Sequence, residues 1–551
     1  AAGEARDLRQ DAAQLKTQLA AGDFDPARAT AQRIESRADR LSFLTSGPAW
    51  AITSRLPYAG APLETMRGAA AAMSDLAHHG MTALTAAAQD LDPASLRQPD
   101  GSFAVDRILG AAPQITQAAD ALDAAARAVR ALPAHTWSST ADRARSQLLD
   151  QLDSARGDAD AARAAAQAAP ALLGAQAPAR YFLGFQNEAE ARGTGGLPGS
   201  FAILEVDHGA FKFTQFQADS YLDGVDSGVD LGLPFYAAYG RYSSTSLLVN
   251  SNMSAHFPYA AQIWAGMWQA KTGQRIDAAL AIDPTALGYL LKAAGPVTLD
   301  TGQAVTGDNV AELTQEGAYR QFPTDEVARK AFLTDLARTV SEHLLAPGTN
   351  PTALLRAAAH AVSERRILLW SADPGAQSAI EPFGLSGSIP QTDDPYSGFT
   401  VNNAGGNKLD YYLDRSIAWS ANGCGPTRTV TATLTLTNNA PTSGLSNYVS
   451  GRLDNPPYPV ARGDNLELVS YYATAGAVVK SVTVNGEPVP GVNSQQELGH
   501  PLIRFAVELP IGQQQQVVIT LQEPNNGAAP HILRQPLVRP LDVTATLPTC
   551  G

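Results

Sequence analysis

The sequence is poor in cysteine, in basic residues and in long apolar runs. Its 551 residues contain two cysteines, and neither lies in a CxxC motif or near a histidine at metal-ligand spacing, so a zinc site is not expected. Lys and Arg number 40 against 53 Asp and Glu, and the resulting formal charge of −13 argues against a nucleic-acid binder. No apolar run reaches the roughly 18 residues that cross a bilayer, so no membrane-spanning helix is predicted.

The two cysteines, Cys424 and Cys550, stand before and after the last series of predicted strands. We expect one disulfide that joins the two ends of a single domain and stabilises it by roughly 3–5 kcal/mol; two unrelated buried thiols are the alternative. A disulfide implies an oxidising compartment. The sequence begins at Ala1 without a visible signal peptide. We therefore expect a mature extracytoplasmic chain, secreted or held at the cell envelope, whose signal or membrane tether lies outside this sequence.

Three segments differ in amino-acid composition and hydrophobic pattern, and together they predict a multidomain α+β protein. Hydrophobic residues make up 44% of the chain and charged residues 17%, which excludes a disordered chain and allows a sizeable core. Residues 1–172 are rich in Ala, and apolar residues such as Leu8, Leu15 and Leu19 recur at helical spacing. This segment predicts a bundle of long antiparallel helices, a stalk or spacer, followed by a linker over Ala165–Pro178.

Residues 178–385 predict an α/β domain with a mixed sheet. Apolar strands are expected at Arg180–Phe185, Thr245–Asn250, Ile276–Ile282 and Arg366–Trp370. A hairpin is expected where two strands flank the turn Asp207-His208-Gly209, and it makes an all-parallel sheet improbable. Helices that cover the sheet are predicted at Pro258–Thr272, Pro284–Ala294, Asp308–Tyr319, Thr324–Leu345 and Thr352–Glu364.

Residues 395–551 predict an immunoglobulin-like β-sandwich. A Gly-, Ser- and Asn-rich stretch, Ser386–Asn407, is interpreted as irregular, and short alternating strands follow it. The predicted strands are Thr429–Leu436, Leu466–Tyr472, Val478–Val484, Leu502–Leu509, Gln515–Leu521 and Leu541–Leu547.

A polar, Gly-rich stretch, Gln186–Ser200, lies between two apolar strands and is expected at one end of the sheet, where α/β folds place ligands. Its glycine N–H groups and Arg192 would suit a phosphate, although the P-loop lysine is absent. Its carboxyl groups, beside amides and a guanidinium, would instead suit a sugar, given a second carboxylate across the cleft. A purely structural connection is the alternative to both.

Candidates for the second carboxylate follow in the sequence. Asp219, Asp223 and Asp226 stand in a polar loop after the hairpin, and Asp277 begins a strand. Each has a plain structural interpretation as well: turn formation for the loop aspartates, a solvated strand end for Asp277, and helix capping for Asp283.

Another polar cluster, Asn250–Pro258, links a strand to a helix N-terminus. Asn250, Asn252 and His256 could contact sugar hydroxyls or phosphate. The alternative is that the asparagines satisfy turn backbone and that Ser254 caps the helix.

No GxSxG or HExxH motif is present, and no metal or other cofactor is predicted. Near the start of the helix Thr324–Leu345, Arg320, Asp325 and Arg329 are interpreted as a salt-bridge cluster.

The strings YFLGFQNEAEARGTGGLPGS at Tyr181–Ser200 and NSNMSAHFP at Asn250–Pro258, with Ile276–Pro284, resemble the actinobacterial "domain of unknown function 4012" family. The resemblance implies a glycoside hydrolase, an endo-D-arabinanase that cleaves arabinofuranosyl linkages in the arabinogalactan and lipoarabinomannan of the cell wall with a pair of carboxylates. It implies Glu190 as one of the pair, with Asp223, Asp226 or Asp277 as the other. The residues expected to hold the sugar are Gln186, Asn187, Glu188, Arg192, Thr194, Asn250, Asn252 and His256.

The order of elements in residues 178–375 also resembles, distantly, the LytR–CpsA–Psr phosphotransferase domain. That resemblance implies action on polyprenyl pyrophosphate-linked glycans, with dependence on Mg²⁺, Arg192 and Arg329; Asn187, however, stands where an acidic residue is expected. A third interpretation is a non-catalytic scaffold that binds cell-wall glycan. The expected partner is a cell-wall arabinan and not a nucleic acid.

Overall fold

The computed structural model describes residues 2–21, 23–54, 56, 58–92, 96–346, 348–492 and 494–549. The chain is 45% helical and 25% strand, which confirms a mixed α and β protein. It divides near Pro178 into two compact units, and the short segments Asp207–Ala210 and Ser378–Ile380 group with the first. Among the described helices, none combines the length and the hydropathy needed to span a membrane.

The first unit consists of helices, as predicted. Its seams are lined by small residues, with Ala27, Ala31 and Ala38 packing beside Leu15 in one cluster, so the helix backbones approach closely. The predicted linker is wrong in its first half, because the last helix continues to Leu172; the high helix propensity of alanine outweighs the break expected there. The helices are α1 (Ala2–Ala21), α2 (Phe24–Ser46), α3 (Pro48–Thr53), α4 (Ala61–Leu76), η1 (Ala77–Met81), α5 (Thr82–Asp90), α7 (Val105–Arg130) and α8 (Ser139–Leu172).

The second unit contains a mixed five-stranded sheet in the order β3-β2-β1-β4-β7. Strand β1 pairs parallel with β4 and antiparallel with β2, and β4 pairs antiparallel with β7. Because β2 and β3 form a hairpin, β3 runs in the direction of β1, so the carboxyl ends of β1, β3 and β4 meet at one edge. The strands are β1 (Ala179–Arg192), β2 (Gly195–Asp207), β3 (Ala210–Ala218), β4 (Ala278–Ile282) and β7 (Ile367–Ser371).

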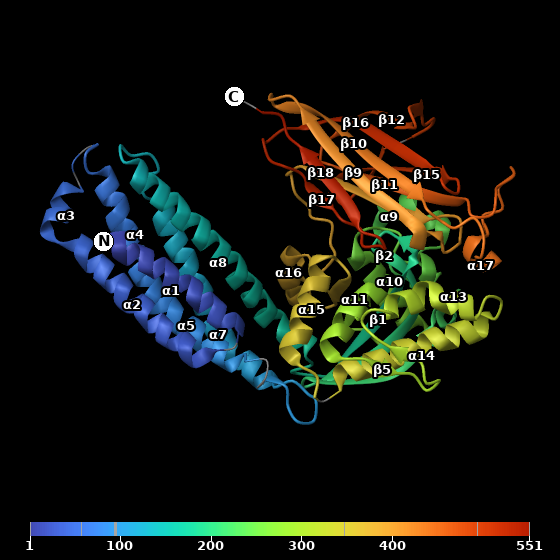
Figure 1. Ribbon diagram of the computed structural model, residues 1–551, viewed down its shortest axis with the longest axis horizontal. Coiled ribbons are helices and arrows are strands. Elements are labelled where there is room, and N and C mark those ends of the chain that lie inside the picture. Colours follow the sequence, from blue (N-terminus) through green and yellow to red (C-terminus); the bar gives the residue numbers. More distant parts are fainter. Residues whose placement is uncertain are drawn as a thin grey trace. The chain divides into compact units, whose positions relative to one another are not determined.

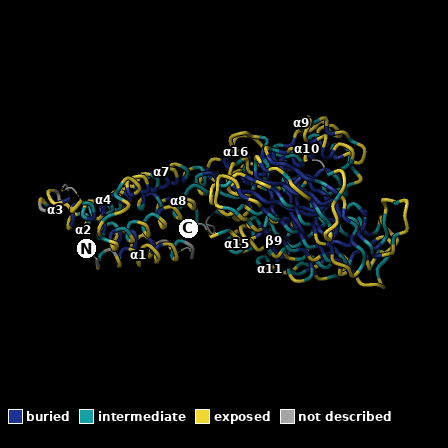
Figure 2. The backbone as a smooth tube through the Cα atoms, turned by 90° about the horizontal axis from the view of Figure 1, so that it is seen from above, coloured by how far each residue is buried: buried dark blue, intermediate teal, exposed yellow. Residues whose placement is uncertain are grey.

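Helices cover both faces of this sheet (Figure 1). Successive residues of a strand point to opposite faces, and Phe182 accordingly packs against Trp264, while Leu183 joins a different core with Leu287 and Leu336. Strands β1, β2, β4 and β7 are largely buried, whereas the edge strand β3 is not. Exposed segments lie on the outside of the unit (Figure 2). The covering helices, close to prediction, are α10 (Phe257–Thr272), α11 (Pro284–Ala294), α14 (Glu326–Leu345) and α15 (Pro351–Ser363).

Two predicted elements of this domain are wrong. The expected strand Thr245–Asn250 is a turn that ends in a 3₁₀ helix, η4 (Leu248–Asn250), in which the backbone N–H of Asn250 donates to Leu247 O at 3.0 Å and not to a neighbouring strand. The expected helix Asp308–Tyr319 is interrupted. It consists of α12 (Val310–Glu312), the π-helical η5 (Leu313–Gly317) and α13 (Ala318–Gln321).

The C-terminal part forms two sheets that share one hydrophobic core, with the orders β13-β12-β16-β10-β9-β18 and β14-β15-β11-β8-β17. Strands β10 (Thr427–Asn438), β11 (Asn465–Ala473) and β16 (Gln514–Pro524) confirm the predicted alternation. The remaining strands are β8 (Tyr396–Asn403), β9 (Leu413–Asn422), β12 (Val478–Val484), β13 (Glu487–Pro488), β14 (Ser494–Glu497), β15 (His500–Leu509), β17 (His531–Leu533) and β18 (Leu541–Thr546).

Strand β8 lies inside the stretch predicted to be irregular. All its residues are buried, between β11 and β17, so it lacks the alternation of a half-exposed strand. The sandwich and the α/β domain also share a core, in which Tyr472 and Leu502 pack with Trp264. Both therefore belong to one compact unit.

Cys424 is disulfide-bonded, and none of the described cysteines is free. Its predicted partner, Cys550, lies outside the described residues.

Candidate functional site

The polar stretch Gln186–Ser200 is an extension of the β1–β2 hairpin and not an open loop. Its glycines serve close approaches: a Cβ on Gly193 would lie 2.3 Å from Met253 O, and one on Gly196 would lie 2.1 Å from the backbone of Asn187. The Ala191 amide donates to Asp410 of the C-terminal part at 2.6 Å. The hairpin tip is thus buried against the C-terminal segment, and its glycines do not form a phosphate cradle.

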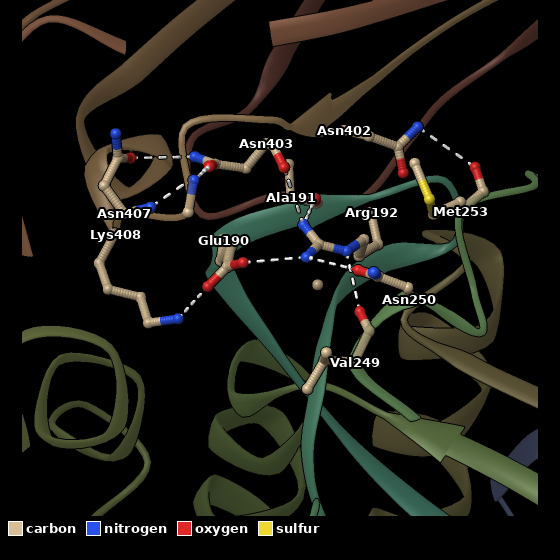
Figure 3. A network of polar contacts seen from close by, with 12 residues as sticks. Glu190, Ala191, Arg192, Val249, Asn250, Met253, Asn402, Asn403, Asn407 and Lys408 are labelled. Atoms are coloured by element: carbon tan, nitrogen blue, oxygen red, sulfur yellow. Dashed lines mark hydrogen bonds and ion pairs between the residues drawn. The ribbon is translucent and has the colours of Figure 1, made fainter. Parts of the chain in front are cut away.

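Glu190 lies between two buried cations (Figure 3). Its Oε1 accepts a hydrogen bond of 2.9 Å from Arg192 Nη2, and its Oε2 is bound by Lys408 Nζ. Burial raises the pKa of Glu190, but the charges of Lys408 and Arg192 outweigh burial and hold this pKa below its ordinary value. With both oxygens occupied, the carboxylate predicted to be catalytic holds the hairpin in place.

The other polar side chains of the hairpin are also engaged in internal contacts. Arg192 donates to Val249 O at 2.9 Å, to Ala191 O at 2.8 Å and to Asn250 Oδ1 at 3.2 Å. Thr194 Oγ1 accepts hydrogen bonds of 2.9 Å from both Gln186 and Asn252. These contacts favour the structural alternative for this group of residues.

Glu188 belongs to a second buried ionic cluster. It is fully buried, and its carboxylate is bound by Arg366 and by Gln315 Nε2. Arg366 also pairs with Asp283 at 2.9 Å, and Asp283 caps α11 by accepting from the Ala286 amide at 2.7 Å, as predicted. Burial, followed by the charge of Glu188, raises the pKa of Asp283 well above its ordinary value.

His256 is buried at the N-terminus of α10. Its Nδ1 accepts a hydrogen bond of 3.1 Å from the Ile389 amide. Burial, with the charge of Arg365 as a smaller cause, lowers the pKa of His256 to about 3. The ring is therefore neutral at physiological pH and links α10 to the segment before β8.

The predicted aspartates are not brought together with Glu190. Asp277 accepts from the Arg180 amide at 3.0 Å at the start of β1, whereas Glu190 lies near the other end of that strand. Asp226 accepts from the Gly228 amide at 3.0 Å, which is the predicted turn role. Asp223 lies beside Asp219; partial burial, then the Asp219 charge, raise the pKa of Asp223 against the opposing charge of Lys330.

A pocket of about 100 Å³ opens at the edge where β1, β3 and β4 end. A water molecule takes about 30 Å³ of liquid, so this volume suits one small group. Its apolar wall comes from the sheet, α11 and α14, and its polar lining from Gln186, Asn187 and Asp219 and from the cations Arg329, Lys330 and Lys408. We call it the arginine pocket. The apolar wall consists chiefly of Phe185, Leu197, Ile282, Leu287, Leu333 and Leu336.

Arg329 differs from the other cations of this pocket. Lys330 pairs with Asp219 at 3.0 Å, and Lys408 pairs with Glu190. Arg329 is only 3% exposed and donates to Phe322 O at 2.8 Å, whereas its Nη2 has no hydrogen-bond partner among the described residues. The predicted salt bridge with Asp325 is not formed, because Asp325 caps α14 by accepting from the Ala328 amide.

Two tyrosines hold the guanidinium of Arg329. Its Cζ lies 3.8 Å from the centre of the Tyr448 ring and 5.3 Å from that of Tyr319, and the two rings are stacked 5.8 Å apart. Asn187 Nδ2 donates to the Tyr319 hydroxyl at 2.8 Å. The arrangement fixes a buried cation that lacks an anionic partner within the described chain, a geometry suited to an anionic ligand.

Sequence reasoning missed Lys330, Lys408, Tyr319 and Tyr448 as members of this site. Arg329-Lys330 stands in the first turns of a predicted helix, which was the one local signal. Within the described residues, no cluster of three or more His, Cys, Asp or Glu side chains is arranged to hold a metal ion.

No curated protein and no solved structure matches the sequence at a significant level. Residues 176–319, which include β1, β2 and the first half of the α/β domain, match the family model described as "Protein of unknown function (DUF4012)". This match supports the family that the motifs around Gln186–Ser200 and Asn250–Pro258 predicted.

Proposed function

We propose that the α/β domain binds the phosphate groups of a polyprenyl pyrophosphate-linked glycan and forms the donor site of a glycan phosphotransferase, which transfers the glycan phosphate and releases polyprenyl phosphate. The observation that carries this proposal is the buried Arg329, which lines the arginine pocket and whose Nη2 lacks a hydrogen-bond partner in the part of the chain that the structure describes. Charge-assisted hydrogen bonds from a guanidinium to a phosphate are among the strong polar contacts in proteins.

The charge balance of the pocket supports an anionic ligand. The charge of Lys330 is compensated by Asp219 and that of Lys408 by Glu190, so Arg329 contributes one uncompensated positive charge. The neighbouring wall of Leu and Phe side chains would contact the first carbons of an apolar chain attached to the phosphate. A phosphate joined to an apolar chain occurs both in the polyprenyl pyrophosphate-linked donor and in the polyprenyl phosphate that the reaction releases.

Arg329→Met tests this proposal, because methionine retains an apolar stem and removes the charge. We expect farnesyl phosphate, a short polyprenyl phosphate, to bind about tenfold to a hundredfold more weakly to this variant, as measured by titration calorimetry. Arg329→Lys should recover part of the affinity. Farnesol and inorganic phosphate should each bind the native protein more weakly than farnesyl phosphate does.

The matched control is Arg338→Met on the same helix, since Arg338 is 44% exposed and pairs with Asp335. It should bind farnesyl phosphate as the native protein does. Equal affinities of the two methionine variants, or no binding to the native protein, would refute the proposal.

A second candidate function is the endo-D-arabinanase implied by the family resemblance, and the observation that favours it is the Asp219–Asp223 pair. A carboxyl group with a raised pKa beside a second carboxylate is the arrangement that glycosidases use. Under this candidate, Asp223 is the general acid and Glu190 is structural.

Incubation with arabinogalactan, with the products resolved by size, tests the second candidate. We expect a ladder of arabino-oligosaccharides, and Asp223→Asn should lower the rate of release about a hundredfold or more. Asp226→Asn, in the same loop but engaged with the Gly228 amide, is the control and should retain the rate. No release by the folded native protein eliminates this candidate.

A further inference from the structure

A second pocket, of about 490 Å³, adjoins the arginine pocket. Tyr319 and Lys408 line both pockets, so they share a wall. The volume lies in the range of roughly 300–1,000 Å³ typical of small-molecule sites. We call it the tyrosine pocket, after Tyr319, Tyr411 and Tyr412.

The tyrosine pocket is formed by two parts of the second unit. One side comes from η5 and α13, and the other from η7 (Leu409–Tyr412) and the loop before α17 (Asn447–Ser450). Segment η5 is π-helical, a distortion that occurs frequently at functional sites. It brings Gln315 and Glu316 to the pocket.

The aromatic rings form a corner. The rings of Tyr411 and Tyr412 are 5.1 Å apart at an angle of 80°, and both side chains are half-buried. The Tyr412 hydroxyl donates to Glu316 Oε1 at 3.3 Å. Ring faces beside hydrogen-bonding groups suit sugars, which present C–H faces to aromatic rings and hydroxyls at their rims.

Gln315 provides an acceptor without a partner. The residue is 1% exposed, its Nε2 donates to Glu188, and its Oε1 has no hydrogen-bond partner among the described residues. A buried amide oxygen without a hydrogen bond destabilises the protein by its desolvation free energy. A hydroxyl group of a ligand in the pocket could donate the missing hydrogen bond.

The charges of the tyrosine pocket favour a neutral ligand. Arg320 pairs with Glu316 at 3.3 Å and also with Glu312, and Lys408 pairs with Glu190. Each cation of the described lining is therefore paired with a carboxylate here, although Lys408 shares Glu190 with Arg192, whereas Arg329 in the adjoining pocket has no such pair among the described residues.

From these contacts we infer that the tyrosine pocket binds the neutral sugar units of the substrate, with the rings of Tyr411 and Tyr412 stacked against them and Gln315 accepting from a hydroxyl. The inference rests on the proposed function for the place of the phosphate in the arginine pocket. The arginine pocket then holds the phosphate end of the substrate, and the tyrosine pocket holds its sugar units. The substrate runs from one pocket to the other past Tyr319 and Lys408.

The test is titration of the full chain with arabinotetraose, galactotetraose and mannotetraose, with binding detected by saturation-transfer NMR. We expect at least one to bind, and Tyr411→Ala and Tyr412→Ala to weaken its binding about tenfold or more. Tyr411→Phe, which retains the ring, should preserve binding and serves if the alanine variants do not fold. Tyr458→Ala is the control, because Tyr458 is an exposed tyrosine of the same unit outside both pockets, and it should bind as the native protein does.

Farnesyl phosphate is titrated against the same variants to separate the two pockets. Tyr411→Ala should keep farnesyl phosphate binding, and Arg329→Met should keep oligosaccharide binding. If no tetraose binds at millimolar concentration while farnesyl phosphate does, the inference fails and the proposed function stands. If a tetraose binds in a Tyr411-dependent manner while farnesyl phosphate does not, the proposed function fails and the tyrosine pocket is a sugar site alone. Equal weakening by Tyr411→Ala and Tyr458→Ala overturns the inference.

Discussion

Replacing Glu190 by glutamine is expected to lower the free energy of unfolding of the second unit by about 3–5 kcal/mol. The carboxylate compensates Lys408 and Arg192, and the three side chains are at most 8% exposed. Removal of its charge leaves two cations buried without a counter-ion, which costs far more than the loss of a surface pair. Urea denaturation, monitored by tryptophan fluorescence, measures this change in the free energy of unfolding.

The matched control is Glu205→Gln on β2, because Glu205 is 41% exposed and pairs with Arg180 at 2.9 Å. Its cost should be at most about 1 kcal/mol. Glu190→Gln combined with Lys408→Met removes one of the two uncompensated cations and should recover part of the stability. Equal costs for Glu190→Gln and Glu205→Gln would contradict the structural role of Glu190.

A second large effect is expected from His256 as the pH falls. In the folded protein burial and Arg365 lower the pKa of His256 to about 3, whereas the ordinary value, which applies to the unfolded chain, is 6.5. Between these values the unfolded chain binds a proton that the folded protein does not, so stability is full above pH 6.5 and falls as the pH decreases. The slope is about 1.4 kcal/mol per pH unit for this one group.

Urea denaturation at several pH values between 3 and 7 checks this expectation, by comparison of the native protein with His256→Asn. Asparagine does not titrate, so the difference in free energy of unfolding between the two proteins should shrink with falling pH. The same substitution at His360, an exposed histidine of α15, is the control for the effect of replacing a histidine that is not buried. A difference between native protein and His256→Asn that is constant over this range would show that His256 titrates alike in both states.

Local patterns predicted the elements whose determinants are local. Helix α11 begins at Pro284 after the capping Asp283 and ends before Gly295, all of which can be read from adjacent residues. Strand β8 escaped prediction because its polar residues are buried by strands distant in sequence. Asn403, for example, donates to Asn465 Oδ1 at 3.3 Å, and Asn465 is 62 positions away in β11. No pattern within Tyr396–Asn403 reports those partners.

In the candidate site, too, features with local determinants could be predicted and those that depend on residues distant in sequence could not. The position of Gln186 and Asn187 between two apolar strands predicted one end of the sheet, and both residues line the arginine pocket. The structural role of Glu190 could not be predicted from the sequence, because its second counter-ion, Lys408, stands in a different part of the sequence. Likewise, the sequence predicted that Arg329 pairs with Asp325, whereas in the structure Arg329 lies over the ring of Tyr448.

The buried tip of the β1–β2 hairpin has a consequence for biosynthesis. Gln535 Nε2 donates to Arg192 O at 2.7 Å, and the two residues are 343 positions apart. At ribosomal rates of about 5–20 residues per second, the hairpin waits roughly 20–70 s for this partner. During that interval the Arg192 carbonyl lacks this partner, so the second unit is expected to reach its final form only after Gln535 has been synthesised.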